Sequence, residues 1–178
     1  MGQDEAPVEA PVGAPVEGQP QRPLAVFDVD GVLADVRHRL HHVERRPKDW
    51  NAFFAAALDD PPLEQGVELA KASAEDCDVV YVTGRPERCR ADTLTWFRRH
   101  GLPEGELRMR DDRDRRPARV ATPGRLRRLA GDRPVAVVVD DDLQVCDAYE
   151  AAGYRVLRAT WMTAPPALQQ AQEDEGRT

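Results

Sequence analysis

The feature that most limits the fold of this chain is the stretch at residues 135–142, Val-Ala-Val-Val-Val-Asp-Asp-Asp. Continuous rather than alternating apolarity, here over Val135–Asp140, is typical of a strand covered on both faces, as in a parallel sheet. Leu24–Asp28 is a second apolar run that ends in an acidic residue. Three further apolar runs complete a set of five predicted strands: Val79–Thr83, Leu107–Met109 and Tyr154–Leu157.

Stretches with helical patterning lie between these runs. Leu63–Ala74, Glu87–His100 and Leu143–Ala152 are predicted helices, and glycine directly follows the last two, as is typical of a helix end. Alternation of strands and helices predicts an α/β fold, a doubly wound parallel sheet with right-handed crossovers. Ligands of such sheets bind beyond the carboxyl ends of the strands.

Polar residues follow three of the predicted strands. Asp28 and Asp30 follow the first, residues 83–85 (Thr-Gly-Arg) the second, and Asp140 and Asp141 the fourth. Because the carboxyl ends of parallel strands share one edge, we expect these groups to lie together. Carboxylates gathered there repel one another, and the arrangement persists when a cation lies between them. The sequence therefore predicts a cation site at one rim of the sheet.

These motifs, with residues 28–32 reading Asp-Val-Asp-Gly-Val, resemble in type and order the signature of the haloacid dehalogenase (HAD) superfamily of phosphatases. The resemblance covers about residues 24–160. Finer detail, such as Asp-Trp at 49–50 and Asp-Asp-Asp-Leu-Gln-Val at 140–145, is similar to the branch that contains the 3′-phosphatase domain of polynucleotide kinase. The resemblance implies a HAD-like Rossmannoid sheet in the order 3-2-1-4-5, with a small helical cap insert at about residues 34–62.

The resemblance also implies Mg²⁺-dependent hydrolysis of phosphomonoesters. Asp28 would attack phosphorus and form an aspartyl-phosphate. Asp30 would protonate the leaving oxygen and then deprotonate the attacking water. Magnesium would be held by Asp28, the backbone carbonyl of Asp30 and the carboxylate of Asp141, with Asp140 in support.

The motif Thr83, Gly84 and Arg85 is expected to bind the phosphoryl group. Thr83 would donate from its hydroxyl and backbone N–H to a phosphoryl oxygen, near the start of the next helix. Arg85 would make a bidentate contact with the phosphate.

One position departs from the family pattern. The family places a lysine, sometimes an arginine, before the fourth strand, and Thr122 stands at the matching position. We interpret Thr122 and Pro123 as a helix N-cap and its first residue. Arg119 or Arg125, each three residues away, would supply the missing charge. Two alternatives stay open: a catalytically weak or inactive module that binds phosphate and metal, and a phosphotransferase.

The favoured partner is a nucleic-acid end with a 3′-phosphate or a nucleotide, within a wider class of phosphorylated small molecules. The formal net charge of −7 argues against non-specific adhesion to nucleic acid. Six arginines nevertheless crowd into residues 108–119 among three aspartates. We interpret them as a solvated, internally paired loop, with an anion-binding loop as the alternative.

The two ends of the chain are predicted to be disordered tails around one domain at residues 23–163. Residues 1–22 are rich in proline and repeat Ala-Pro-Val three times, and residues 164–178 are polar. The three cysteines have no metal-ligand spacing, and neither a signal peptide nor a membrane span is recognisable. We therefore expect a cytoplasmic protein, and nothing in the sequence specifies its oligomeric state.

Overall fold

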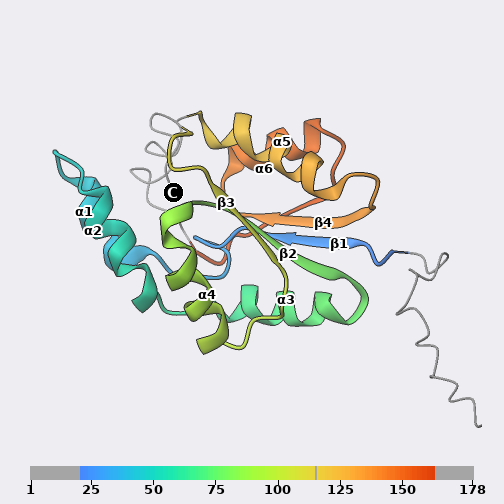
Figure 1. Ribbon diagram of the computed structural model, residues 1–178, viewed down its shortest axis with the longest axis horizontal. Coiled ribbons are helices and arrows are strands. Elements are labelled where there is room, and N and C mark those ends of the chain that lie inside the picture. The colour runs from blue at the N-terminus through green and yellow to red at the C-terminus, as the bar shows by residue number, and fades with distance from the viewer. Residues whose placement is uncertain (1–20, 115, 163–178) are drawn as a thin grey trace, which may run out of the picture.

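The computed structural model describes residues 21–114 and 116–162. Apart from positions 21 and 22, the predicted tails lie outside these residues. Five parallel strands form one sheet in the order β3-β2-β1-β4-β5 (Figure 1), so the predicted α/β class and strand order are confirmed. The strands are β1 Leu24–Phe27, β2 Asp78–Pro86, β3 Glu106–Arg110, β4 Val135–Asp140 and β5 Val156–Arg158.

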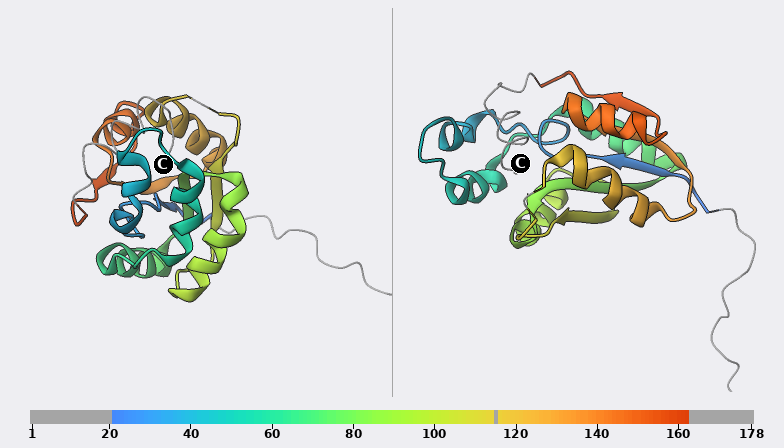
Figure 2. Two further views of the ribbon diagram at one scale, coloured as in Figure 1. Left: turned by 90° about the vertical axis from the view of Figure 1, so that its left-hand side faces the viewer. Right: turned by 90° about the horizontal axis from the view of Figure 1, so that it is seen from above.

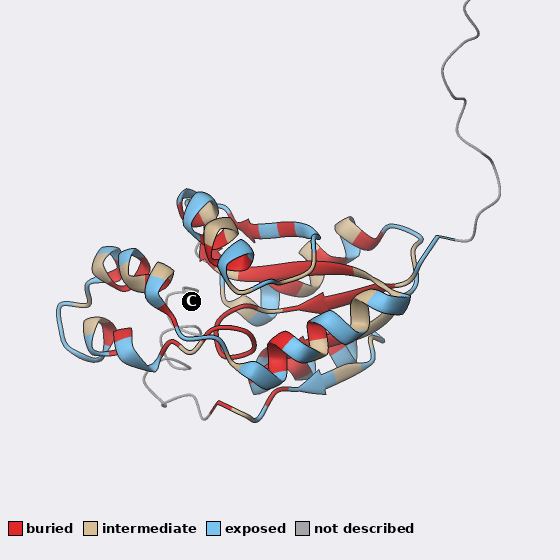
Figure 3. Ribbon diagram, turned by 90° about the horizontal axis from the view of Figure 1, so that it is seen from below, coloured by how far each residue is buried: buried red, intermediate tan, exposed pale blue. Residues whose placement is uncertain are grey.

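The central strand β1 is buried on both faces, as its continuous apolarity predicts. Ala25 and Phe27 point into one half of the core, and Leu24 and Val26 into the other, because successive side chains of a strand alternate. Helices α3 (Glu64–Asp76) and α4 (Arg90–Arg99) cover the first face, and α5 (Ala118–Ala130) and α6 (Leu143–Ala151) cover the second (Figure 1). Figure 3 shows buried strands between helices whose outer sides are exposed.

Helix α5 begins five residues earlier than the sequence indicates, at Ala118 rather than at Pro123. Thr122 and Pro123 lie inside it rather than at its start, and Pro117 is the N-cap residue. A proline within a helix removes one backbone hydrogen bond. One face of α5 is nevertheless buried, and it consists of Ala121, Thr122, Leu126 and Ala130. The start of the helix is therefore determined by the packing of that face against the sheet and not by the local cap signal.

The insert between β1 and α3 consists of short helices that lie beyond the carboxyl ends of the strands (Figures 1 and 2). They are the 3-10 turn η1 (Arg37–Arg39), α1 (His41–Glu44), α2 (Trp50–Ala55) and the 3-10 turn η2 (Ala56–Asp59). Asp49 caps α2 by accepting a hydrogen bond from the N–H of Ala52 at 2.9 Å. Trp50, Phe53 and Phe54 pack ring against ring at helical spacing. A further 3-10 turn, η3 (Glu87–Cys89), joins β2 to α4.

Across the described parts of the chain, no helix has both the length and the apolarity that a membrane crossing requires.

Candidate active site

Three carboxylates gather at the carboxyl ends of β1 and β4, where the sequence places a cation site. Asp28, Asp140 and Asp141 each direct one oxygen into the group, and these oxygens lie within 4.8 Å of one another. Asp140 and Asp141 are buried and Asp28 is partly exposed. Oxygen ligands at this separation suit a hard divalent cation. The side chain of Asp30 is not part of this group.

The protein compensates the charges in this group only in part, because burial and mutual repulsion outweigh the backbone and arginine contacts that favour the ionised forms. Burial, and then repulsion by Asp140, raises the pKa of Asp28 well above its ordinary value. Burial, and then repulsion by Asp141, does the same to the pKa of Asp140. The pKa of Asp141 rises to about 7, chiefly through burial, and its buried Oδ1 makes no hydrogen bond to the described residues. A bound cation would neutralise the cluster and satisfy that oxygen, so the residues fit a divalent metal.

Asp142, the third acid of the run at residues 140–142 at the carboxyl end of β4, has a different role. Its Oδ1 accepts hydrogen bonds from the N–H of Gln144 at 2.8 Å and of Val145 at 3.2 Å, and so caps α6. The Asp142 N–H donates to Asp140 Oδ1 at 3.0 Å. One acid of the triplet therefore caps the helix while the other two face the cluster.

Gly31 allows the cluster to form. Its φ of +85° is a conformation that residues with side chains rarely adopt, and a Cβ there would lie 2.2 Å from Asp141 Oδ2. The glycine in the Asp-Val-Asp-Gly motif therefore leaves space for a carboxylate that arrives from another strand.

Asp30 lies beside the cluster in a buried network of two arginines and two aspartates. Asp30 Oδ1 accepts from Arg39 Nη2 at 2.9 Å and from Arg85 Nε at 2.9 Å. Asp60 Oδ1 accepts from Arg39 Nε at 2.7 Å, and Asp60 Oδ2 accepts from Arg85 Nη2 at 2.8 Å. All four side chains are at most 1% exposed. Equal numbers of opposite charges, joined by hydrogen bonds, make this burial tolerable.

The network determines which oxygen of Asp30 is available. Its Oδ1 is held by the two arginines, whereas Oδ2 is buried and makes no hydrogen bond to the described residues. Burial acts to raise the pKa of Asp30, but the charges of Arg39 and Arg85 outweigh it and leave that pKa below its ordinary value. Asp30 is therefore ionised at neutral pH, with one oxygen for further chemistry.

The network also places Arg85 differently from the sequence-based expectation. Its guanidinium contacts Asp30 and Asp60 instead of lining the pocket at Asp28. The physical reason is burial, because a guanidinium this deep in the protein requires carboxylate partners. Of the other two residues of the motif, Gly84 lines the pocket at Asp28 and Thr83 does not. Thr83 is buried within β2, where its Oγ1 accepts from the N–H of Arg85 at 3.2 Å.

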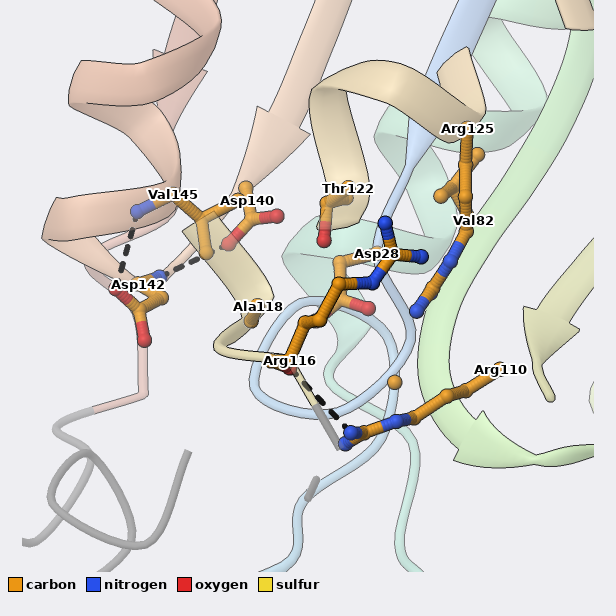
Figure 4. Close-up of a pocket in the computed structure, with 11 residues that line it drawn as sticks. Asp28, Val82, Arg110, Arg116, Ala118, Thr122, Arg125, Asp140, Asp142 and Val145 are labelled. Atoms are coloured by element: carbon orange, nitrogen blue, oxygen red, sulfur yellow. Dashed lines mark hydrogen bonds between the residues drawn. The ribbon is translucent and has the colours of Figure 1, made fainter. Parts of the chain in front are cut away.

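A narrow pocket, about 20 Å³ in volume, opens over Asp28 (Figure 4). Arg125 lines it, whereas Arg119 is exposed on the first turn of α5 and does not. Of the two arginines considered as substitutes for the family lysine, the structure brings only Arg125 to the pocket. Thr122, which stands at the lysine position, also lines it.

Arg39 and Asp60 are site residues that sequence reasoning missed, and Arg110 was noted only as one of the six arginines at residues 108–119. Arg110 ends β3, is 4% exposed and lines the pocket over Asp28. The rule that ligands bind at the carboxyl ends of strands, applied to the third strand, would have found it. Arg39 lies at helical spacing between Val36 and Val43, on the apolar side of the insert. No local signal marks Asp60.

The fold and the acidic rim define a HAD-type phosphatase, and comparison with known families agrees. The model of the polynucleotide kinase PNKP phosphatase domain matches residues 23–161, and the chain belongs to this family. No curated protein sequence shows significant similarity to the chain.

Several solved structures share the fold. Two of them come from structures of a Pnkp1/Rnl/Hen1 complex. The first is 20% identical to this chain, covers 78% of this chain and 45% of its own length, and has a TM-score of 0.67. The second is 18% identical, covers 85% of this chain and 46% of its own length, and has a TM-score of 0.63. A class C acid phosphatase from Bacillus anthracis is 14% identical over 88% of this chain and 79% of its own, with a TM-score of 0.59. The chain thus spans less than half the length of the first two.

Proposed function

We propose that this chain is a Mg²⁺-dependent phosphomonoesterase that acts through an aspartyl-phosphate on Asp28, with nucleic-acid 3′-phosphates or nucleotides as substrates. The observation that carries the proposal is the pocket in which Asp28, beside Asp140, faces the guanidinium-bearing residues Arg110 and Arg125. Such a pocket brings together a nucleophile and the positive charge that binds an anionic group.

In the first step a carboxylate oxygen of Asp28 attacks phosphorus, and the bond between phosphorus and the leaving oxygen breaks. Asp30 Oδ2 gives a proton to that oxygen, which departs as an alcohol. In the second step Asp30 takes a proton from water, the water oxygen attacks phosphorus, and the bond to Asp28 breaks to release phosphate. Proton transfer through one carboxyl group in both steps balances the cycle.

Asp30 must carry a proton at the start of the first step, although Arg39 and Arg85 favour its ionised form. A phosphate dianion that enters the pocket adds negative charge close by and raises the pKa of the carboxyl. Substrate binding therefore favours protonation of Asp30, and departure of the phosphoryl group favours its ionised, basic form.

Asp28, Asp140 and Asp141 would hold Mg²⁺, with the backbone carbonyl of Asp30 as a further ligand. When bound, the ion supplies charge that offsets repulsion between the carboxylate nucleophile and the anionic phosphoryl group. On the protein's side, Arg110 and Arg125 would contact phosphoryl oxygens, as would Thr83 and the backbone at Gly84. Arg85 and Arg39 would act by orienting Asp30.

The proposal that nucleic-acid ends are substrates is supported by membership of the PNKP phosphatase domain family and by the fold shared with chains of the Pnkp1/Rnl/Hen1 complex. The insert is small, with α1 and α2 together spanning His41–Ala55. A cap of this size leaves room for a polymer end to enter.

The test is phosphate release from an aryl phosphate, a nucleoside 3′-monophosphate and a 3′-phosphorylated oligonucleotide, with and without Mg²⁺. We expect Asp28→Asn to abolish release and Asp132→Asn, an exposed control, to retain it. Mass spectrometry of Asp30→Asn mixed with the aryl phosphate, whose leaving group departs without a proton from Asp30, should detect one added phosphoryl group. Release by Asp28→Asn at the wild-type rate would refute the mechanism, and phosphate transfer to an added alcohol would identify a phosphotransferase.

A further inference from the structure

A second, wider pocket adjoins the one over Asp28. Its volume is about 380 Å³, and it shares Arg116 and Arg125 with the narrow pocket. It lies between β3, the loop that follows β3, and α5. The narrow pocket has space for about one water-sized group, so most of a substrate must lie outside it. The wider pocket has the volume of a ligand site.

The charge of the wider pocket is positive, although the chain as a whole is acidic. Four arginines line it against two aspartates: Arg108, Arg116, Arg125, Arg128, Asp111 and Asp114. Another pocket of about 310 Å³ also adjoins the narrow one, but two arginines and three aspartates line it. An anionic part of a substrate is therefore attracted to the first of these neighbours and not to the second.

The arginines of the wider pocket retain capacity for an anion. Asp114 Oδ2 is shared by Arg116 Nη2 at 2.8 Å and Arg125 Nη2 at 3.5 Å, so one carboxylate faces two guanidiniums. Arg108 pairs with Glu106, but about half of each side chain is exposed, and exposed ion pairs contribute little. Arg128 has no hydrogen bond or ion pair with the residues that the structure describes.

We propose that this pocket binds a second phosphate group of the substrate. The preferred substrate is then a phosphomonoester that carries another phosphate one nucleoside away, either a nucleoside bisphosphate or the end of an oligonucleotide. The inference rests on the proposed function, because it places the reacting phosphate at Asp28. Arg108 and Arg128 contact only the second phosphate, whereas Arg116 and Arg125 lie between the two.

The test compares KM for a nucleoside 3′-monophosphate, the corresponding 3′,5′-bisphosphate and a 3′-phosphorylated dinucleotide. We expect KM of wild type to be about tenfold lower for substrates with a second phosphate, since hydrogen bonds to charged groups are strong. If KM is lower for the bisphosphate alone, the pocket binds a terminal phosphate. If KM is lower for the dinucleotide as well, the pocket also binds a backbone phosphodiester. An equal KM for all three would overturn the inference.

Variants locate the effect. Arg128→Ala and Arg108→Ala should raise KM for the two-phosphate substrates several times more than KM for the monophosphate. Arg127→Ala is the matched control, because Arg127 is exposed on the same turn of α5 and lines none of the three pockets. Loss of the preference in Arg127→Ala, or its persistence in the Arg108→Ala, Arg128→Ala double variant, would overturn the inference.

A failure of the proposed function can be distinguished from a failure of the inference about the second phosphate. If no substrate releases phosphate, calorimetry with the Asp28→Asn variant measures the Kd of the bisphosphate, which does not depend on turnover. A Kd that Arg128→Ala raises about tenfold supports the pocket, and a Kd that this substitution leaves unchanged overturns it.

Discussion

Arg85 Nε lies 2.9 Å from Asp30 Oδ1, and both side chains are about 1% exposed, although the residues are 55 positions apart in the chain. The pair joins the turn after β1 to the end of β2. Arg39, from the insert, contacts the same oxygen at 2.9 Å, and its guanidinium lies 4.1 Å from the centre of the Phe53 ring. The insert is thereby tied to the acid–base residue of the proposed mechanism.

We expect substitution of Arg85 to impair both stability and turnover. Arg85→Ala leaves Asp30 and Asp60 without one of two guanidiniums and should lower the free energy of unfolding by about 3–5 kcal/mol. Arg85→Lys keeps the charge but cannot reproduce the forked contact with both carboxylates, so kcat should fall more than KM rises. Urea unfolding and steady-state kinetics measure the two effects. Arg98→Lys, exposed on α4, is the control, and an unchanged kcat in Arg85→Lys would contradict the positioning role.

Gly31 and Gly101 form a matched pair for testing the cation site. Both have positive φ, +85° and +64°, but a Cβ at Gly101 meets no atom within 4 Å, whereas one at Gly31 meets Asp141 Oδ2 at 2.2 Å. Alanine at either position should cost about 1–2 kcal/mol through backbone strain. Only Gly31→Ala should also weaken Mg²⁺ binding, by about tenfold or more, as measured by calorimetry. Equal Mg²⁺ affinity of the two variants would argue against Asp141 as a ligand.

Arg125 is expected to replace the lysine of the family pattern. Arg125→Ala should lower kcat by about 10²–10³, the loss typical of a group that stabilises transition-state charge. Thr122→Lys, introduced into Arg125→Ala, should restore part of that loss, because Thr122 lines the same pocket. Arg119→Ala should change kcat by less than about threefold, since Arg119 lies outside the pocket. A larger loss in Arg119→Ala than in Arg125→Ala would reverse the assignment.

Removal of the metal should make stability depend on pH in a defined direction. Burial and mutual repulsion raise the pKa of Asp141 to about 7 and also raise that of Asp28 and Asp140. A folded-state pKa above the unfolded value contributes stability that is present below about pH 4 and is lost as the pH rises through 7. In EDTA, Tm should therefore fall by about 4 °C or more between pH 5.5 and pH 8. Saturating Mg²⁺ should raise Tm more at pH 8 than at pH 5.5, and Asp28→Asn should reduce the pH dependence. Thermal melts in EDTA that rise with pH would contradict the cluster.

The strands and the cluster of Asp28, Asp140 and Asp141 could be predicted from the sequence, because both depend on local signals, whereas the order of the strands was implied by the resemblance to the HAD superfamily. Continuous apolarity marks buried strands, and in a parallel sheet the residues that follow them meet at one edge. The start of α5 could not be predicted in the same way. Thr122 and Pro123 carry a strong local cap signal, which packing of the helix against the sheet overrides.

The amino-acid sequence by itself determined the strands of the sheet and its acidic rim, since short-range patterning and the topology of a parallel sheet suffice for these. Only the tertiary structure decided that Arg85 holds Asp30, that Arg39 and Asp60 complete the network, and that Arg110 and Arg125 reach the pocket. A charged side chain is stable in the interior only beside opposite charges. Those partners come from distant parts of the chain, and no local pattern records them.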